Sequence, residues 1–272
     1  MSRAELNVAS LSTITTEIAQ NVGGTAVKVL PIIKLGVDPH EFQLSPADVR
    51  QIEGAELVLL SGKGMEGYLT KLKDAVERKE KFVDVGAVIP SLKLKEHGEI
   101  IEDPHWWQSI ENVKKATIEI KKRFVQADPA NQSTFETNAN HYLAQLSELQ
   151  KWAKREISQL PPERRKLVTS HDAFHYFARD YGFEIYAIDG VSTEDEPSSK
   201  KVATLIKTVR DQGVKAVFFE SIENREVVQE ITKETNAKIG GELFADGLQN
   251  KEGSTYSDTF RHNVTTIVQS LR

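Results

Sequence analysis

The chain has 272 residues, a length that suits two domains better than one. Hydrophobic residues make up 39% of it and charged residues 28%, which is typical of a globular protein. The net charge of −5 excludes the strongly basic surface that nucleic-acid binding requires. The longest apolar runs are too short to cross a membrane. There is no cysteine, which excludes disulfides, thiolate metal sites and cysteine nucleophiles.

The first part of the chain alternates short β-branched runs with longer amphipathic stretches. Strands are expected at residues 6–10, 25–31, 56–61 and 82–85, and helices at residues 13–21 and 66–79. Another helix is expected to begin at Ser45 and Pro46, with the serine as N-cap and the proline at the first helical position. This alternation predicts a parallel sheet with helices on both faces.

A long helical segment occupies the middle of the chain. Residues 110–126 are expected to form one helix, which the Asp128-Pro129 step ends. Residues 131–160 then have a single helical pattern with large apolar residues near one face. A helix of about 30 residues would be about 45 Å long, which is longer than one small lobe.

Strands and helices alternate again after Pro161 and Pro162. Strands are expected at residues 167–170, 183–188, 216–220 and 237–243, and helices at residues 173–181, 198–212, 225–235 and 259–271. The predicted fold is therefore α/β, with two similar lobes of mainly parallel sheet joined by one long rigid helix. The predicted divisions are an N-terminal lobe at residues 1–128, a linking helix at 129–160 and a C-terminal lobe at 161–272.

Four side chains with metal-binding chemistry stand at equivalent places in this pattern. His171 and Asp246 directly follow predicted strands, and His40 and His105 lie in loops just ahead of predicted helices. Ligands of open α/β sheets bind beyond the carboxyl ends of the strands, so all four are expected at that kind of edge. Three imidazoles and one carboxylate suit a borderline divalent cation.

The sequences around these residues support the same interpretation. Both His40 and His105 end an Asp-Pro-His segment, in which proline stiffens the loop that presents the histidine. Asp38 and Asp103 are candidates to orient the histidine rings by hydrogen bonds. His175 lies four residues after His171, but without the glutamate of a His-Glu-x-x-His helix it is interpreted as a packing or supporting residue.

Each candidate taken alone also has a purely structural explanation. Asp-Pro is a common turn start, so either Asp-Pro-His segment is compatible with a surface histidine. His171 is compatible with a helix cap and Asp246 with a turn residue before Gly247. The joint placement of the four residues at helix starts favours the metal site.

The segments that carry these residues resemble the motifs of one family, the cluster A-I solute-binding proteins, which serve zinc- and manganese-type ABC transporters. The resemblance lies in Gly-Val-Asp-Pro-His-Glu-Phe at residues 36–42 with Ser-Pro-Ala-Asp at 45–48, Asp-Pro-His-Trp at 103–106, Ser-His-Asp-Ala-Phe-His-Tyr-Phe at 170–177, and Phe-Phe-Glu at 218–220 with Leu-Phe-Ala-Asp at 243–246. It covers nearly the whole chain, including the long helix. It implies a metal ion in the cleft between the lobes, with ligands His40, His105, His171 and Asp246.

The resemblance leaves the metal open between Zn²⁺ and Mn²⁺. Manganese-dedicated members typically have glutamate at the third ligand position, where this chain has His171, and the added nitrogen favours zinc. Zinc-dedicated members often have a long histidine-rich loop before the second ligand. Here residues 93–103 are short and contain only His97, which points the other way.

The resemblance also implies a place and a partner. Family members act outside the cytoplasmic membrane, in the periplasm or as lipoproteins, and deliver metal to the membrane permease of an ABC transporter. The chain shows no signal sequence and no lipid-bearing cysteine, so a trimmed mature form or a free periplasmic protein is expected. A monomer is expected, with no nucleic-acid partner.

Other functions are less consistent with the sequence. A zinc hydrolase is the main alternative, with His40, His105 and His171 as ligands and Asp246 or Glu220 as base. No substrate-pocket motif supports it. An adhesin or interaction module is less favoured, and no glycine-rich phosphate loop is present. The chain is therefore expected to be a binding protein and not an enzyme.

Overall fold

The computed structural model describes residues 5–96, 98–193, 198–220 and 225–272, and His97 thus lies outside the described residues. The chain forms two four-stranded parallel sheets and one two-stranded antiparallel sheet. The strands are β1 (Leu6–Ser10), β2 (Val27–Pro31), β3 (Leu57–Leu60) and β4 (Phe82–Asp84) in the first sheet, β7 (Lys166–Thr169), β8 (Glu184–Ala187), β9 (Ala216–Glu220) and β10 (Lys238–Leu243) in the second, and β5 (Lys93–Glu96) and β6 (Glu99–Glu102) in the small one.

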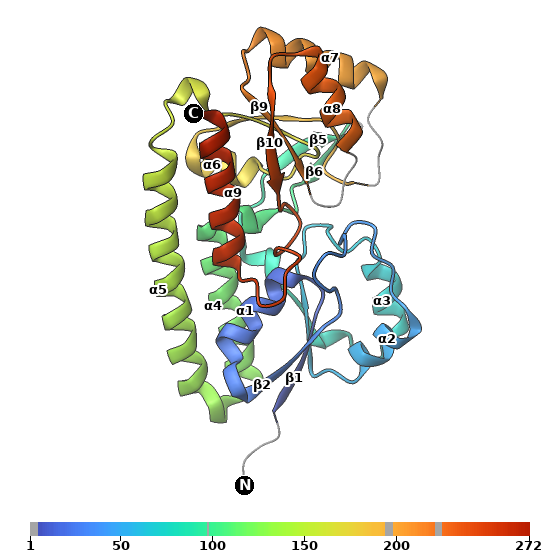
Figure 1. The fold of residues 1–272 in the computed structure, drawn as a ribbon. Helices are drawn as coiled ribbons and strands as arrows, with labels where there is room; N and C mark the ends of the chain where they lie inside the picture. Colours follow the sequence, from blue (N-terminus) through green and yellow to red (C-terminus); the bar gives the residue numbers. More distant parts are fainter. Residues whose placement is uncertain (1–4, 97, 194–197, 221–224) are drawn as a thin grey trace.

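Both parallel sheets have the same strand order. The order is β2-β1-β3-β4 in the first sheet and β8-β7-β9-β10 in the second. The strand order reverses between β1 and β3, and again between β7 and β9. The carboxyl edge at such a reversal is where open α/β sheets bind ligands. Figure 1 shows the first sheet in the lower part of the molecule and the second in the upper part, with β10 pointing toward the first.

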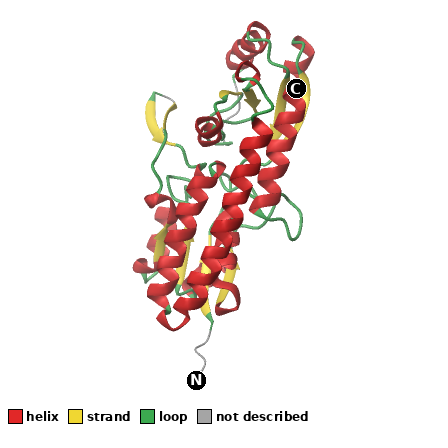
Figure 2. Ribbon diagram, turned by 90° about the vertical axis from the view of Figure 1, so that its left-hand side faces the viewer, coloured by secondary structure: helices red, strands yellow, loops and turns green. Residues whose placement is uncertain are grey.

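Long helices join the two parts along one side. The helices are α1 (Thr13–Gly23), α2 (Pro46–Glu53), α3 (Leu69–Ala75), α4 (Ile110–Ala127), α5 (Gln132–Ile157), α6 (His175–Tyr181), α7 (Ser199–Asp211), α8 (Arg225–Glu234) and α9 (Tyr256–Leu271). Helix α5 contacts α1, α4 and α9. Figure 1 shows α5 along one side of the molecule, and Figure 2, turned by 90°, shows that helices cover this side. None of the described helices is both long and apolar enough to cross a membrane.

Local sequence signals account for several helix ends. Ser45 caps α2 through a hydrogen bond from the backbone of Asp48, whose side chain bonds back to the Ser45 backbone, as expected for a capping box. Thr255 and Asp258 form the same arrangement at the start of α9. Pro161 follows the end of α5, because proline cannot continue a helix.

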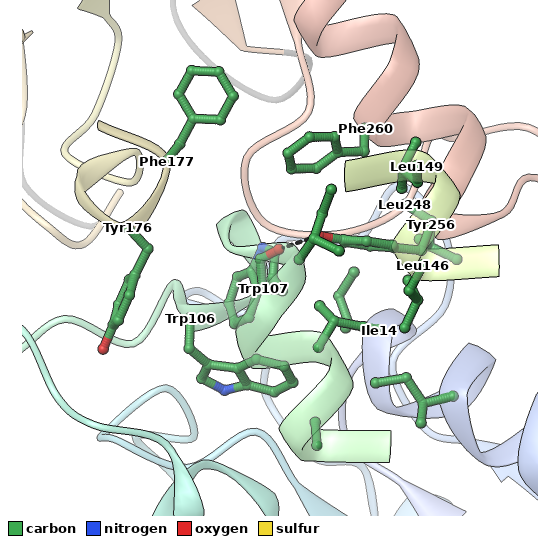
Figure 3. Packing of buried hydrophobic residues seen from close by; sticks show 14 of the residues in the cluster. Ile14, Trp106, Trp107, Leu146, Leu149, Tyr176, Phe177, Leu248, Tyr256 and Phe260 are labelled. Atoms are coloured by element: carbon green, nitrogen blue, oxygen red, sulfur yellow. Dashed lines mark hydrogen bonds between the residues drawn. The ribbon is translucent and has the colours of Figure 1, made fainter. Parts of the chain in front are cut away.

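One hydrophobic core runs through both sheets and the long helices. It includes Val8 of the first sheet, Phe135 and Leu146 of α5 and Phe218 of the second sheet, all at 0% exposure. Figure 3 shows the part of this core around Trp107, whose carbonyl accepts a hydrogen bond from the Tyr256 hydroxyl at 2.6 Å. Because the two lobes share a core, the link between them is packed rather than a free hinge.

The structure confirms the predicted fold class, and most elements lie within two or three residues of the prediction. The clearest difference is the hairpin of β5 and β6, which the sequence did not predict. Helix α3 is also shorter than the expected 66–79, and α5 ends at Ile157 rather than 160. Glu66 explains the late start of α3, because its carboxylate accepts the backbone N–H groups of Ser61 and Gly62 within a turn.

Candidate metal centre

The four predicted ligands come together between the two sheets. His40 lies in the loop between β2 and α2, and His105 immediately precedes a short 3₁₀ helix, Trp106–Gln108. His171 follows β7 and Asp246 follows β10. The side chains of His105 and His171 are 0% exposed, and those of His40 and Asp246 are 7% exposed.

The donor atoms of these four residues face a common point. Nε2 of His105 lies 3.3 Å from Nε2 of His40 and 3.4 Å from Nε2 of His171. Oδ1 of Asp246 lies 3.4, 3.1 and 3.3 Å from Nε2 of His40, His105 and His171. A tetrahedral zinc site with bonds of about 2.0–2.1 Å has donor atoms about 3.3–3.4 Å apart. The spacing of the donors therefore matches the edges of such a tetrahedron.

Protons alone satisfy this arrangement poorly. One proton can join two of these nitrogens as an N–H···N hydrogen bond, but the third imidazole then faces the others with a lone pair or with a second positive charge in a buried space. A divalent cation at the common point would accept all three lone pairs and the Asp246 charge. Within the described part of the chain, these four residues are the group whose ligand atoms lie close enough to one another to hold one metal ion.

The pKa values of the metal-free site reflect the same charge distribution. Burial lowers the pKa of His105, but hydrogen bonds with Asp103 and Asp246 outweigh it and raise this pKa to about 9. Burial acts in the same way on His171, and the carboxylates of Asp246 and Glu220 raise its pKa well above the ordinary value. Burial raises the pKa of Asp246, but the neighbouring histidines, His171 first, hold it well below its usual range. The site thus attracts positive charge.

Two carboxylates behind the ligands fix the rings of His105 and His171. Asp103 Oδ1 lies 2.9 Å from Nδ1 of His105 and also accepts the His105 backbone N–H at 2.9 Å. Glu220, the last residue of β9, pairs with Nδ1 of His171 and accepts the His171 backbone N–H at 3.3 Å. A carboxylate at Nδ1 keeps the proton there and leaves Nε2 free to bind a metal.

Asp38 holds the backbone of His40 and not its ring. Its Oδ1 accepts the backbone N–H of His40 at 2.8 Å, whereas the prediction had it orienting a ring. The reason is local geometry, because an Asp side chain two residues before an N–H forms an Asx turn. Its Oδ2 accepts a hydrogen bond from the Thr193 hydroxyl at 2.7 Å.

The loop that presents Asp246 is anchored on the residues that follow His105. Trp107 Nε1 and Gln108 Nε2 both donate to the carbonyl of Ala245, at 2.7 and 2.8 Å. The ring of Trp107 also packs edge-on against His105, with ring centroids 5.5 Å apart. These contacts fix the fourth ligand relative to the second.

Glu220 and His175 lie near the site without belonging to the cluster of four. The contact of Glu220 with His171 was missed, although both residues stand at the ends of the neighbouring strands β9 and β7 and that adjacency was the available signal. His175 pairs with Asp172 at 2.8 Å and lies outside the four-residue cluster, consistent with a supporting part.

His40 borders an open groove of about 510 Å³. Its lining includes Lys63, Met65 and Pro104 of the first lobe and Val191 and Ser192 of the second. Because His40 is the histidine of the cluster that retains some exposure, this groove brings solvent to the His40 side of the site.

Residues 8–270 match the model of the ZnuA family, the periplasmic component A of the zinc-uptake complex. The chain belongs to this family. It is 34% identical to the manganese-binding lipoprotein MntA of Bacillus subtilis (strain 168), over 98% of this chain and 90% of that protein. It is 31% identical to the metal ABC transporter substrate-binding lipoprotein SloC of Streptococcus mutans, over 98% and 90% of the two chains.

Solved structures of other proteins share the fold. The periplasmic zinc-binding protein TroA from Treponema pallidum matches with a TM-score of 0.92 and 29% identity, over 98% of this chain and 99% of that one. The manganese-bound periplasmic metal-binding protein from Candidatus Liberibacter asiaticus matches with a TM-score of 0.90 and 28% identity, over 98% and 100%. The family consists of solute-binding proteins of metal transporters, and this ZnuA-family chain is one of them rather than an enzyme.

Proposed function

We propose that this ZnuA-family protein captures one divalent transition-metal ion outside the cytoplasmic membrane and delivers it, as a monomer, to the permease of an ABC transporter. The ligands in this proposal are His40, His105, His171 and Asp246. The observation that carries it is the convergence of three Nε2 atoms and one Oδ1 atom at 3.1–3.4 Å. Membership of the ZnuA family is the basis for proposing an ABC transporter as the partner.

A closed site favours capture over catalysis. A catalytic zinc has three protein ligands and keeps a fourth position open for water or substrate. Four protein donors at tetrahedral spacing leave no such position for a hydrolase. The hydrolase reading would also assign Glu220 as base, but this carboxylate pairs with His171 behind the site.

Zn²⁺ is the favoured cargo in this proposal, and Mn²⁺ is the second candidate. Three nitrogen donors and one carboxylate bind Zn²⁺ more tightly than Mn²⁺ in the general affinity order. Relatives named for manganese and for zinc are both similar to this chain, and the cell's metal supply also decides which ion is loaded. The preference for zinc rests on the nitrogen donor that His171 supplies.

Metal analysis of a ligand variant tests the assignment. His105→Ala should lose most bound metal, because the site loses a bond and its closed geometry. The matched control is His141→Ala, since His141 is an exposed histidine on α5. Elemental analysis and zinc titration should find one ion per wild-type and control chain. One ion per His105→Ala chain at unchanged affinity would refute the ligand set.

A further inference from the structure

A short segment of the second lobe connects two of the proposed ligands. Residues 188–193, here called the strap, follow β8 and lie beside the residues around His171. The backbone N–H of Ile188 donates to the Thr169 carbonyl at 3.0 Å, and that of Asp189 to the Ser170 carbonyl at 2.7 Å. The Gly190 carbonyl accepts the Asp172 N–H at 2.8 Å. The strap is therefore held in register with both sides of His171.

The other end of the strap reaches the first lobe at Asp38. The Thr193 hydroxyl donates to Oδ2 of Asp38 at 2.7 Å, while Oδ1 of the same carboxylate accepts the His40 backbone N–H at 2.8 Å. Asp38 is 8% exposed and Thr193 is half-buried, so this hydrogen bond is partly buried, and its acceptor is charged. The Asp38 carboxylate thus links Thr193 of the strap to the backbone of His40.

The strap also forms a side of the groove at His40. Val191 and Ser192 line this groove together with His40, and Thr193 lines a smaller cavity on the side of Asp246 and Glu220. The groove on the His40 side is a route by which an ion could leave, and residues of the strap line it. Movement of the strap away from Asp38 would widen this route.

We propose that the Thr193–Asp38 hydrogen bond is a latch that sets the rate at which the bound metal is released. Asp38 is a positioning residue in this proposal, because it acts through His40 and the strap and supplies no metal ligand. The inference rests on the proposed metal-binding function. It adds a specific contact that joins the two lobes beside the groove at His40.

Thr193→Val tests the latch, because valine has nearly the shape of threonine and lacks the hydroxyl. The four donor atoms are untouched, so the visible spectrum of the Co²⁺-loaded variant should equal that of the wild type. Release of Zn²⁺ into excess chelator, followed by stopped flow, should become about tenfold faster, the size expected for losing one hydrogen bond to a charged acceptor. Thr193→Ser keeps the hydroxyl and should release zinc at the wild-type rate.

The controls distinguish a failure of the latch from a failure of the proposed metal-binding function. Thr204→Val removes an exposed threonine hydroxyl from α7 of the same lobe and should leave the release rate unchanged. A wild-type protein without tight zinc binding would refute the proposed function. Normal zinc binding with equal release rates in wild type and Thr193→Val would refute the latch alone, as would equally fast release from Thr193→Val and Thr193→Ser.

Discussion

Glu220→Gln should weaken zinc binding although Glu220 supplies no metal ligand. One oxygen of the wild-type carboxylate accepts a hydrogen bond from the His171 backbone N–H, and the other pairs with ring Nδ1 of His171. Glutamine offers one acceptor oxygen and one NH₂ donor. If its oxygen keeps the backbone N–H, its NH₂ faces Nδ1, which drives the ring proton to Nε2, the atom that would bind the metal.

The expected loss is about 10–100-fold in zinc affinity, the usual cost of removing a carboxylate that supports a ligand histidine. This equals about 1.4–2.7 kcal/mol of binding free energy. Glu220 also raises the pKa of His171 and so favours the proton that competes with the metal. The deficit should therefore be larger at pH 9, where proton competition matters less, than at pH 6.5.

Competition titration against a chromophoric zinc chelator at both pH values measures this effect. Glu230→Gln is the matched control, because Glu230 is an exposed glutamate on α8. An affinity of Glu220→Gln equal to that of the control at pH 9 would show that Glu220 does not set the tautomer of His171.

Three further predictions concern metal, pH and selectivity. Zinc at about 1,000 times its Kd should add about 4 kcal/mol to the free energy of unfolding, and equal Tm values for chelator-treated and zinc-loaded protein would contradict this. The pKa of His105 rises from 6.5 in the unfolded chain to about 9, so protonated His105 stabilises the metal-free protein fully below pH 6.5, and this stabilisation is lost as the pH rises through 9. Zinc affinity should rise over the same pH range. Melting curves of the metal-free protein and zinc titrations across pH 6–10 check the two trends. His171→Glu should shift preference toward Mn²⁺, since a second carboxylate adds a hard oxygen donor, and an unchanged zinc-to-manganese affinity ratio in competition calorimetry would refute it.

The fold was predictable because most strands and helices have a strong local signal. The apolar run of β1 and the Ser45-Pro46 helix start are examples, and both were predicted to the residue. The hairpin of β5 and β6 was not predictable in this way, because its strands, Lys-Leu-Lys-Glu and Glu-Ile-Ile-Glu, are short and mostly charged. Thr255 and Asp258 formed a recognisable capping box that should have placed the start of α9 at 256 rather than 259.

The candidate ligands and the contact of Asp103 with the His105 ring were predictable, whereas the partners of Asp38 were not. Histidine and aspartate types at loop positions after strands indicated His105 and Asp246, whose donors the structure places 3.1 Å apart. The partners of Asp38 depend on which N–H and hydroxyl groups the folded loops bring near. Thr193 lies 155 residues away in the sequence, so no local pattern connects it with Asp38.

The position of Trp107 gives the protein a built-in optical signal. The chain has three tryptophans, and Trp107 packs edge-on against His105 while donating its indole hydrogen bond next to Asp246. A protonated imidazole quenches indole emission by accepting an electron, whereas a metal-bound imidazole stays neutral. Trp152 lies on α5 with its ring stacked on Arg261 of α9, outside the cluster of four residues, and contributes background emission. Loading and unloading of the site can therefore be followed by intrinsic fluorescence, with no attached dye.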